Sequence, residues 1–182
     1  MAFIGCAQSR LSHESDASRS TTPQLEPVAT SEIDAAESSH PLEVTPPQLG
    51  LLDSVRGGHL LDAVVHNNAE LAADLLLPRE AYRSGWDDAH PGKVWEKQIH
   101  IPFKKEIGKK HRQTKRWDQA QLISFELGSS IAQIPQKPKG WKQNCWRVRN
   151  SKLTFRINGT IRQLPIAEMT SWKGSWYITK LR

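Results

Sequence analysis

The spacing of hydrophobic residues divides this chain into three regions. Residues 1–46 are rich in Ser, Thr, Pro, Glu and Ala, and their scattered apolar residues follow no period. Such a segment buries too little apolar surface to offset the loss of chain entropy, so we expect a disordered tail. Residues 47–90 are predicted to form an acidic helical segment, and residues 91–182 a basic α+β domain.

Residues 47–90 show the spacing of short amphipathic helices. Gly57 and Gly58 predict a break between two helical pieces. Asn68 is expected to cap a further helix, which Pro78 would end. The stripe that supports the helix before Asn68 consists of Leu60, Leu61, Val64 and Val65.

Residues 91–135 change from a period of two to a period of three to four. The alternation in residues 94–101 predicts an edge strand. Phe103 and Ile107, surrounded by lysines, predict a short basic helix. Apolar residues three and four apart between residues 117 and 134 predict an amphipathic helix that Pro135 ends.

The remaining residues read as strands, with cations on one face. Residues 145–149 and 152–157 alternate apolar side chains with Arg or Lys, and a last strand is expected in residues 175–181. Asn158-Gly159 predicts a two-residue hairpin turn, because both residues tolerate positive φ. The predicted order is therefore strand, two helices and an antiparallel sheet.

Charge separates the two halves of the chain. Residues 1–90 contain five arginines, no lysine and 14 acidic residues, a net charge of −9. Residues 91–182 contain 20 Lys and Arg residues against five acidic residues, a net charge of +15. The second half should therefore attract polyanions such as nucleic acid.

Other classes of protein find little support in the sequence. No apolar run reaches the ~18 residues of a membrane span. Cys6 and Cys145 are too few for a disulfide framework or a zinc site, and no phosphate-binding glycine loop occurs. We therefore expect no metal, no cofactor, no membrane association and a cytoplasmic location.

Four stretches resemble one family in their order along residues 93–182. "IHIPFKKEIGKK", "IPQKPKGWKQNCWRVRN", "KLTFRINGTIRQLPI" and "WKGSWYITKL" are similar to segments of the RelE/ParE superfamily of toxins. The resemblance implies an α+β fold with two N-terminal helices packed on a small curved antiparallel sheet, here preceded by the tail and the helical segment. It also implies either metal-independent cleavage of mRNA on the ribosome or binding to DNA gyrase.

The same resemblance implies roles for particular residues. Lys152 would hold the scissile phosphate, Lys173 would stabilise charge or act as an acid, and Tyr177 would stack on a base or pass a proton. Arg147 and Arg149 would contact phosphate and balance its charge. Apart from the resemblance, Trp141, Lys142 and Arg156 are further candidates for binding nucleic acid, and Trp141 could stack on a base between cations. The acidic half would replace a separate antitoxin by covering the basic half.

Two further functions remain open from the sequence. The basic half fits a non-enzymatic nucleic-acid-binding module, in which Trp and Arg lie on one sheet face. The tail also fits an export signal of a secreted effector that binds a host protein. Each named residue has an ordinary structural interpretation as well, since charged strand faces, turn lysines and half-buried strand tyrosines are common.

Overall fold

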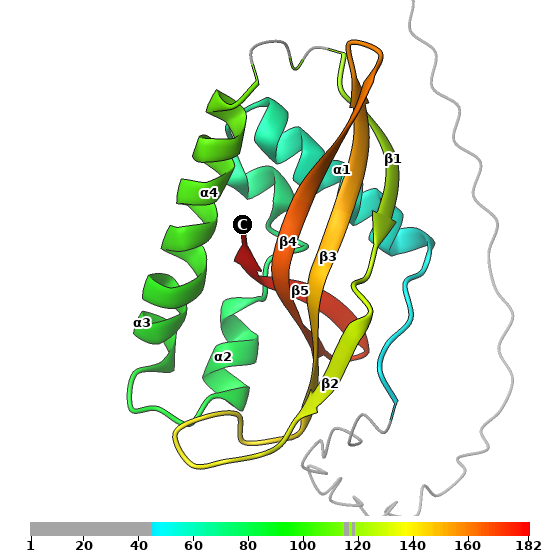
Figure 1. Cartoon of the computed structure of the whole chain (residues 1–182). Helices are drawn as coiled ribbons and strands as arrows, with labels where there is room; N and C mark the ends of the chain where they lie inside the picture. Colours follow the sequence, from blue (N-terminus) through cyan, green and yellow to red (C-terminus); the bar gives the residue numbers. More distant parts are fainter. Residues whose placement is uncertain (1–44, 115–116, 118) are drawn as a thin grey trace, which may run out of the picture. The chain divides into compact units, whose positions relative to one another are not determined.

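Helices come first and an antiparallel sheet follows in the computed structural model, which describes residues 45–114, 117 and 119–182 (Figure 1). The helical elements are α1 (Leu51–Val65), η1 (Ala69–Ala72), α2 (Arg79–Gly85), α3 (Pro91–Trp95), η2 (Glu96–His100) and α4 (Ile101–Arg112). The strands are β1 (Gln121–Glu126), β2 (Ser130–Ile134), β3 (Cys145–Ile157), β4 (Thr160–Trp172) and β5 (Ser175–Leu181). The α+β class is confirmed. The expected arrangement of two helices after an opening strand is wrong, and the predicted tail lies, up to residue 44, outside the described residues.

The β3–β4 hairpin is the centre of the sheet. Its register is continuous from Arg147 opposite Thr170 to Ile157 opposite Thr160. Asn158 and Gly159 have φ angles of 48° and 73°, so the predicted hairpin turn is confirmed. β5 pairs with the free edge of β4, and β1 and β2 both pair with the other edge of β3.

The predicted helix between residues 117 and 134 is wrong, because this segment forms β1 and β2. Its apolar spacing fits a helix, but the exposed edge of β3 offers a full set of backbone hydrogen-bonding partners, which β1 and β2 take. The two strands are separated at Gly128, where a Cβ would overlap the carbonyl oxygen of Arg149. A glycine is therefore required at this point of close backbone approach.

The predicted strand at residues 94–101 is also wrong, since α3, η2 and α4 form one helical run (Figure 1). Ile99, Phe103 and Ile107 are four residues apart and all buried, so a helical period governs this segment. The alternation that suggested a strand is compatible with that period, because positions four apart share a face in both structures. The basic helix expected around Phe103 and Ile107 is confirmed as α4.

α1 continues through the position of the predicted break. Gly57 lies against the sheet, where a Cβ would meet Leu153 at 3.1 Å and Phe125 at 3.2 Å. The glycine thus allows the helix to approach the strands rather than ending it. Asn68 does act as a cap, and its side chain accepts a hydrogen bond from the Glu70 backbone N–H, but the helical turn that it begins, η1, ends at Ala72 and not at Pro78.

Helices and sheet share one hydrophobic core. Leu60 and Val64 of α1, Phe103 of α4, and Met169 and Ile178 of the sheet are almost fully buried in the same cluster. In Figure 1, α1 passes behind the hairpin while α4 runs along its side. Residues on both sides of the predicted boundary between residues 90 and 91 therefore contribute to one core.

Candidate anion-binding cleft

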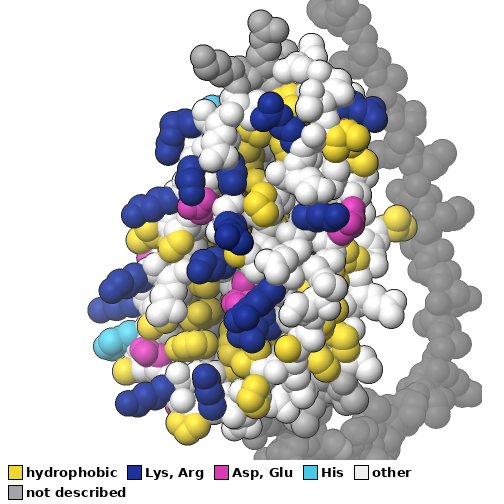
Figure 2. All heavy atoms as spheres, in the orientation of Figure 1, with side chains coloured by type: hydrophobic (Ala, Val, Ile, Leu, Met, Phe, Trp, Pro, Cys, Tyr) yellow, Lys and Arg dark blue, Asp and Glu magenta, His cyan; other side chains and the backbone are white. Residues whose placement is uncertain are grey.

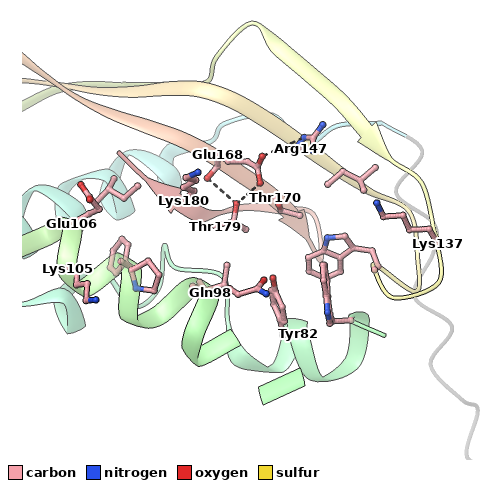
Figure 3. Close-up of a pocket in the computed structure, with 18 residues that line it drawn as sticks. Tyr82, Gln98, Lys105, Glu106, Lys137, Arg147, Glu168, Thr170, Thr179 and Lys180 are labelled. Atoms are coloured by element: carbon pink, nitrogen blue, oxygen red, sulfur yellow. Dashed lines mark hydrogen bonds and ion pairs between the residues drawn. The ribbon is translucent and has the colours of Figure 1, made fainter. Parts of the chain in front are cut away.

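A cleft of about 670 Å³ lies between the helices and one face of the sheet (Figure 3). α2 contributes Tyr82, and the run from η2 to α4 contributes apolar side chains including Ile99 and Phe103. The strands contribute a polar wall that includes Arg147 and Glu168. The side chains of the two layers point toward each other across the cleft (Figure 3).

Three aromatic residues, Tyr82, Trp86 and Trp141, form what we call the aromatic end of the cleft. The ring centroid of Tyr82 is 5.0 Å from that of Trp86 and 5.5 Å from that of Trp141. Gly85 permits the contact, because a Cβ there would lie 3.0 Å from the Trp141 ring. Backbone hydrogen bonds from Lys142 N–H to the Gly85 carbonyl and from Asp87 N–H to the Gly140 carbonyl fix the two segments together. The aromatic end is therefore held in place before any ligand arrives.

Glu168 organises the polar wall on the strands. It lies opposite Arg149 on β3 and Lys180 on β5. Its carboxylate is 3.4 Å from Arg149 Nε and accepts a hydrogen bond of 3.3 Å from the Thr179 hydroxyl. Arg147 Nε is 3.9 Å away, which is too far for a hydrogen bond. Among the described residues, Arg147 therefore forms an ion pair with Glu168 but makes no hydrogen bond.

Two hydroxyl groups add hydrogen-bonding capacity to the cleft. Thr170 lines it with 2% of its surface exposed, and its side chain makes no hydrogen bond within the described part of the chain. Burial, and to a lesser degree the charge of Glu168, raises the pKa of Tyr82 to about 12. The Tyr82 hydroxyl therefore stays protonated at neutral pH and is able to donate.

Four cations from different elements surround the cleft, against two carboxylates. Lys105 of α4, Lys137 of the loop before β3 and Lys180 of β5 are exposed, and Arg147 lies deeper. None of these three lysines has an ion pair among the described residues. The space-filling view shows dark-blue side chains along α4 and on the adjoining sheet (Figure 2). The mouth of the cleft is thus net positive.

The three predicted catalytic residues do not come together. Lys152 pairs with Pro165 in the sheet and Tyr177 with Thr170, which separates them by roughly 16 Å along β4. Lys173 lies in the β4–β5 turn, roughly 26 Å along β4 from Pro165.

Each of these residues has a local partner instead. Lys152 is 3.1 Å from Glu126, and Lys173 is 3.6 Å from Glu80. The Tyr177 ring lies 4.7 Å from the Arg56 guanidinium. No metal cluster of three His, Cys, Asp or Glu residues occurs in the described ranges.

The predicted nucleic-acid-binding residues divide into two groups. Trp141 and Arg147 line the cleft, and Lys142 and Arg149 adjoin them in sequence. Arg156 is seven residues beyond Arg149 on β3, roughly 23 Å away.

Sequence reasoning missed most of the cleft. The missed residues include Tyr82, Trp86, Gln98, Lys105, Lys137, Glu168, Thr170, Thr179 and Lys180. Glu168 carried the one available signal, because it is an isolated carboxylate in a strongly basic run of strands. Nothing in the sequence associates Tyr82 and Trp86 with Trp141.

Ion pairs between the two halves of the chain are few among the described residues. Glu70 is 3.5 Å from Lys104 and 3.7 Å from His100, and Glu80 contacts Lys173. Other acidic residues of the first half pair within it, as Asp53 does with Arg56. The inhibitory role of the acidic half stays a prediction.

Comparison with protein-family models, curated proteins and solved structures found no match for this chain. No helix in the described ranges has the length and apolar character needed to cross a membrane.

Proposed function

We propose that this protein is a non-enzymatic module that binds nucleic acid through its cationic surface. The supporting observation is a row of exposed lysines on α3, η2 and α4 that have no carboxylate partner within the described residues. These are Lys93, Lys97 and Lys105, which we call the cationic ridge. The ridge adjoins the cleft, since Lys105 belongs to the ridge and also lines the cleft.

Four cations of the sheet and its last turn have a carboxylate partner, whereas the lysines of the ridge have none among the described residues. Arg147, Arg149, Lys152 and Lys173 each lie within 4 Å of a carboxylate. An ion-paired cation attracts a phosphate less strongly, because the nearby carboxylate already offsets part of its charge. Uncompensated lysines on a small body release counterions from a phosphate backbone and bind it without reading sequence.

Binding is favoured over cleavage for a geometric reason. Cleavage by attack of a ribose 2′-OH on the neighbouring phosphate needs a base for the hydroxyl, an acid for the leaving 5′-oxygen and cations at that phosphate. The separation of Lys152 from Lys173 and Tyr177 along the sheet does not supply this convergence. The mRNA cleavage and the gyrase binding implied by the toxin resemblance stay predictions.

Fluorescence anisotropy with a labelled 20-nucleotide RNA, over a series of salt concentrations, tests the proposal on the full chain. Affinity should fall steeply with salt. The triple variant Lys93→Gln, Lys97→Gln, Lys105→Gln should lower the slope of log K against log[salt] by about two, because each phosphate contact contributes about 0.7.

A control variant removes the same number of charges elsewhere. Lys109→Gln, Lys152→Gln, Lys173→Gln, at three lysines that each form an ion pair, should leave the slope almost unchanged. Equal slopes for the two triple variants would contradict the role of the ridge. Absence of salt-dependent binding by the unmodified chain would overturn the function, and shortened RNA in the same samples would favour the nuclease.

A further inference from the structure

The dimensions of the cleft fit one nucleotide rather than a duplex. Its volume of about 670 Å³ is within the range of small-molecule sites, roughly 300–1,000 Å³. A base inside a duplex is stacked and paired, and its edges and faces are not free to enter such a cleft. Single strands can turn a base outward, and proteins commonly recognise them in this way.

The helical wall and the aromatic end of the cleft offer apolar surface to a flat ring. On the helical side, Ile99, Pro102 and Phe103 line it. At the aromatic end, Trp86 is only partly buried, lines the cleft with Tyr82 and Trp141, and is in ring contact with both. Stacking on such surfaces tolerates any base, because every base has a π face.

Polar groups at the sheet wall match the rest of a nucleotide. The Arg147 guanidinium is a planar fork of donors that suits a phosphate. Glu168 is held by Arg149 and Thr179 and is able to accept from a base N–H. Thr170 and Gln98 offer further hydrogen bonds. Lys137 and Lys180 at the mouth would meet the neighbouring phosphates.

We infer that the cleft holds one unpaired nucleotide of a bound strand, its base toward the aromatic end and its phosphate at Arg147. This inference rests on the proposed function and names the form of nucleic acid that the protein selects. It gives the two parts of the surface different roles. The cationic ridge attracts any polyanion, and the cleft distinguishes single strands from duplexes.

Three measurements on the full chain test the inference. The first compares the affinity for a 12-nucleotide single-stranded RNA with that for the blunt duplex of the same length, at one salt concentration. The single strand should bind tighter, on the order of tenfold, which is the size of one base-stacking contribution. The second measures whether adenosine monophosphate quenches tryptophan fluorescence and displaces the labelled single strand.

The third measurement uses two variants on the same strand. Arg147→Gln should remove the preference for the single strand, again by about tenfold. Arg156→Gln is the matched control, because Arg156 is exposed on β3, has no ion pair within the described residues and does not line the cleft. Circular dichroism and thermal melting of both variants show whether either has lost its fold.

The possible outcomes test this inference separately from the proposed nucleic-acid-binding function. Equal affinity for single strand and duplex, with no effect of adenosine monophosphate, would overturn the inference and leave salt-dependent binding intact. Equal effects of Arg147→Gln and Arg156→Gln in folded protein would overturn it as well. Quenching by adenosine monophosphate without any RNA binding would retain the nucleotide site and overturn the proposed function.

Discussion

Arg56 connects three segments of the structure, and replacing it should cost more stability than any surface arginine. Its side chain is only 13% exposed. Its guanidinium donates to the Asp74 carbonyl at 3.1 and 2.7 Å, to the Trp176 carbonyl at 2.9 Å and to the Asp53 carboxylate at 2.9 Å. It also lies 4.7 Å from the Tyr177 ring centroid. One side chain thereby joins three segments, namely α1, the residues that follow η1, and β5.

The loss of stability in Arg56→Met follows from the hydrogen bonds that are removed and the carbonyl groups that lose their donor. A hydrogen bond from a charged donor contributes about 1.5–3 kcal/mol, and a buried carbonyl that loses its partner costs about 1–3 kcal/mol. The Trp176 carbonyl belongs to a fully buried residue, whereas Asp74 is exposed and water is able to replace its bond. Met retains most of the aliphatic stem. Since these contributions do not add, we expect a loss of about 3 kcal/mol.

Guanidinium chloride unfolding at 25 °C measures this loss. Arg83→Met is the control, because Arg83 is exposed on α2 and has no ion pair in the described part of the chain; it should change stability by less than about 0.5 kcal/mol. A loss below about 1 kcal/mol for Arg56→Met would refute the reasoning, since it would mean that water satisfies both carbonyls. The cation–π contact is tested by combining Arg56→Met with Tyr177→Leu and measuring the coupling free energy.

Three further predictions concern single positions. Gly128→Ala should destabilise the fold by about 2–3 kcal/mol in the same assay, because the added Cβ overlaps the backbone of β3; an unchanged midpoint would contradict this. Absorbance at 295 nm, in a variant whose other tyrosine is phenylalanine, should show Tyr82 ionising near pH 12. Glu168→Gln should lower that pKa slightly, because burial is the larger cause. Since the folded pKa exceeds the unfolded value of about 10, Tyr82 contributes stability below pH 10, and this is lost as the pH rises through about 12. Lys152→Ala should raise the lowered pKa of Glu126 only part of the way in an NMR titration, because the hydrogen bond from Ser124, the largest single cause of the lowered pKa, remains; full recovery to the ordinary value would contradict the contribution of Ser124.

Local conformational preferences made some elements readable from the sequence alone. Asn158-Gly159 specified the hairpin turn because few residue pairs accept positive φ at both positions. Phe103 and Ile107 specified a helix because their spacing buries one stripe. Asn68 specified a cap because its side chain satisfies a free N–H of the following turn. Charge was equally readable, since it is a property of composition.

Only the tertiary structure decided the secondary structure of the segment between residues 117 and 134, and which residues line the cleft. The apolar spacing of that segment suits either a helix or a strand, and the free edge of β3 decided for strands. Arg147 and Arg149 look equivalent in sequence. They differ because Glu168, 19 residues beyond Arg149, is close enough to accept a hydrogen bond from Arg149 but forms only a longer ion pair with Arg147. The sequence of a strand determines which donors and acceptors it presents. The segment that pairs with them is determined by the packing of residues far away in the sequence.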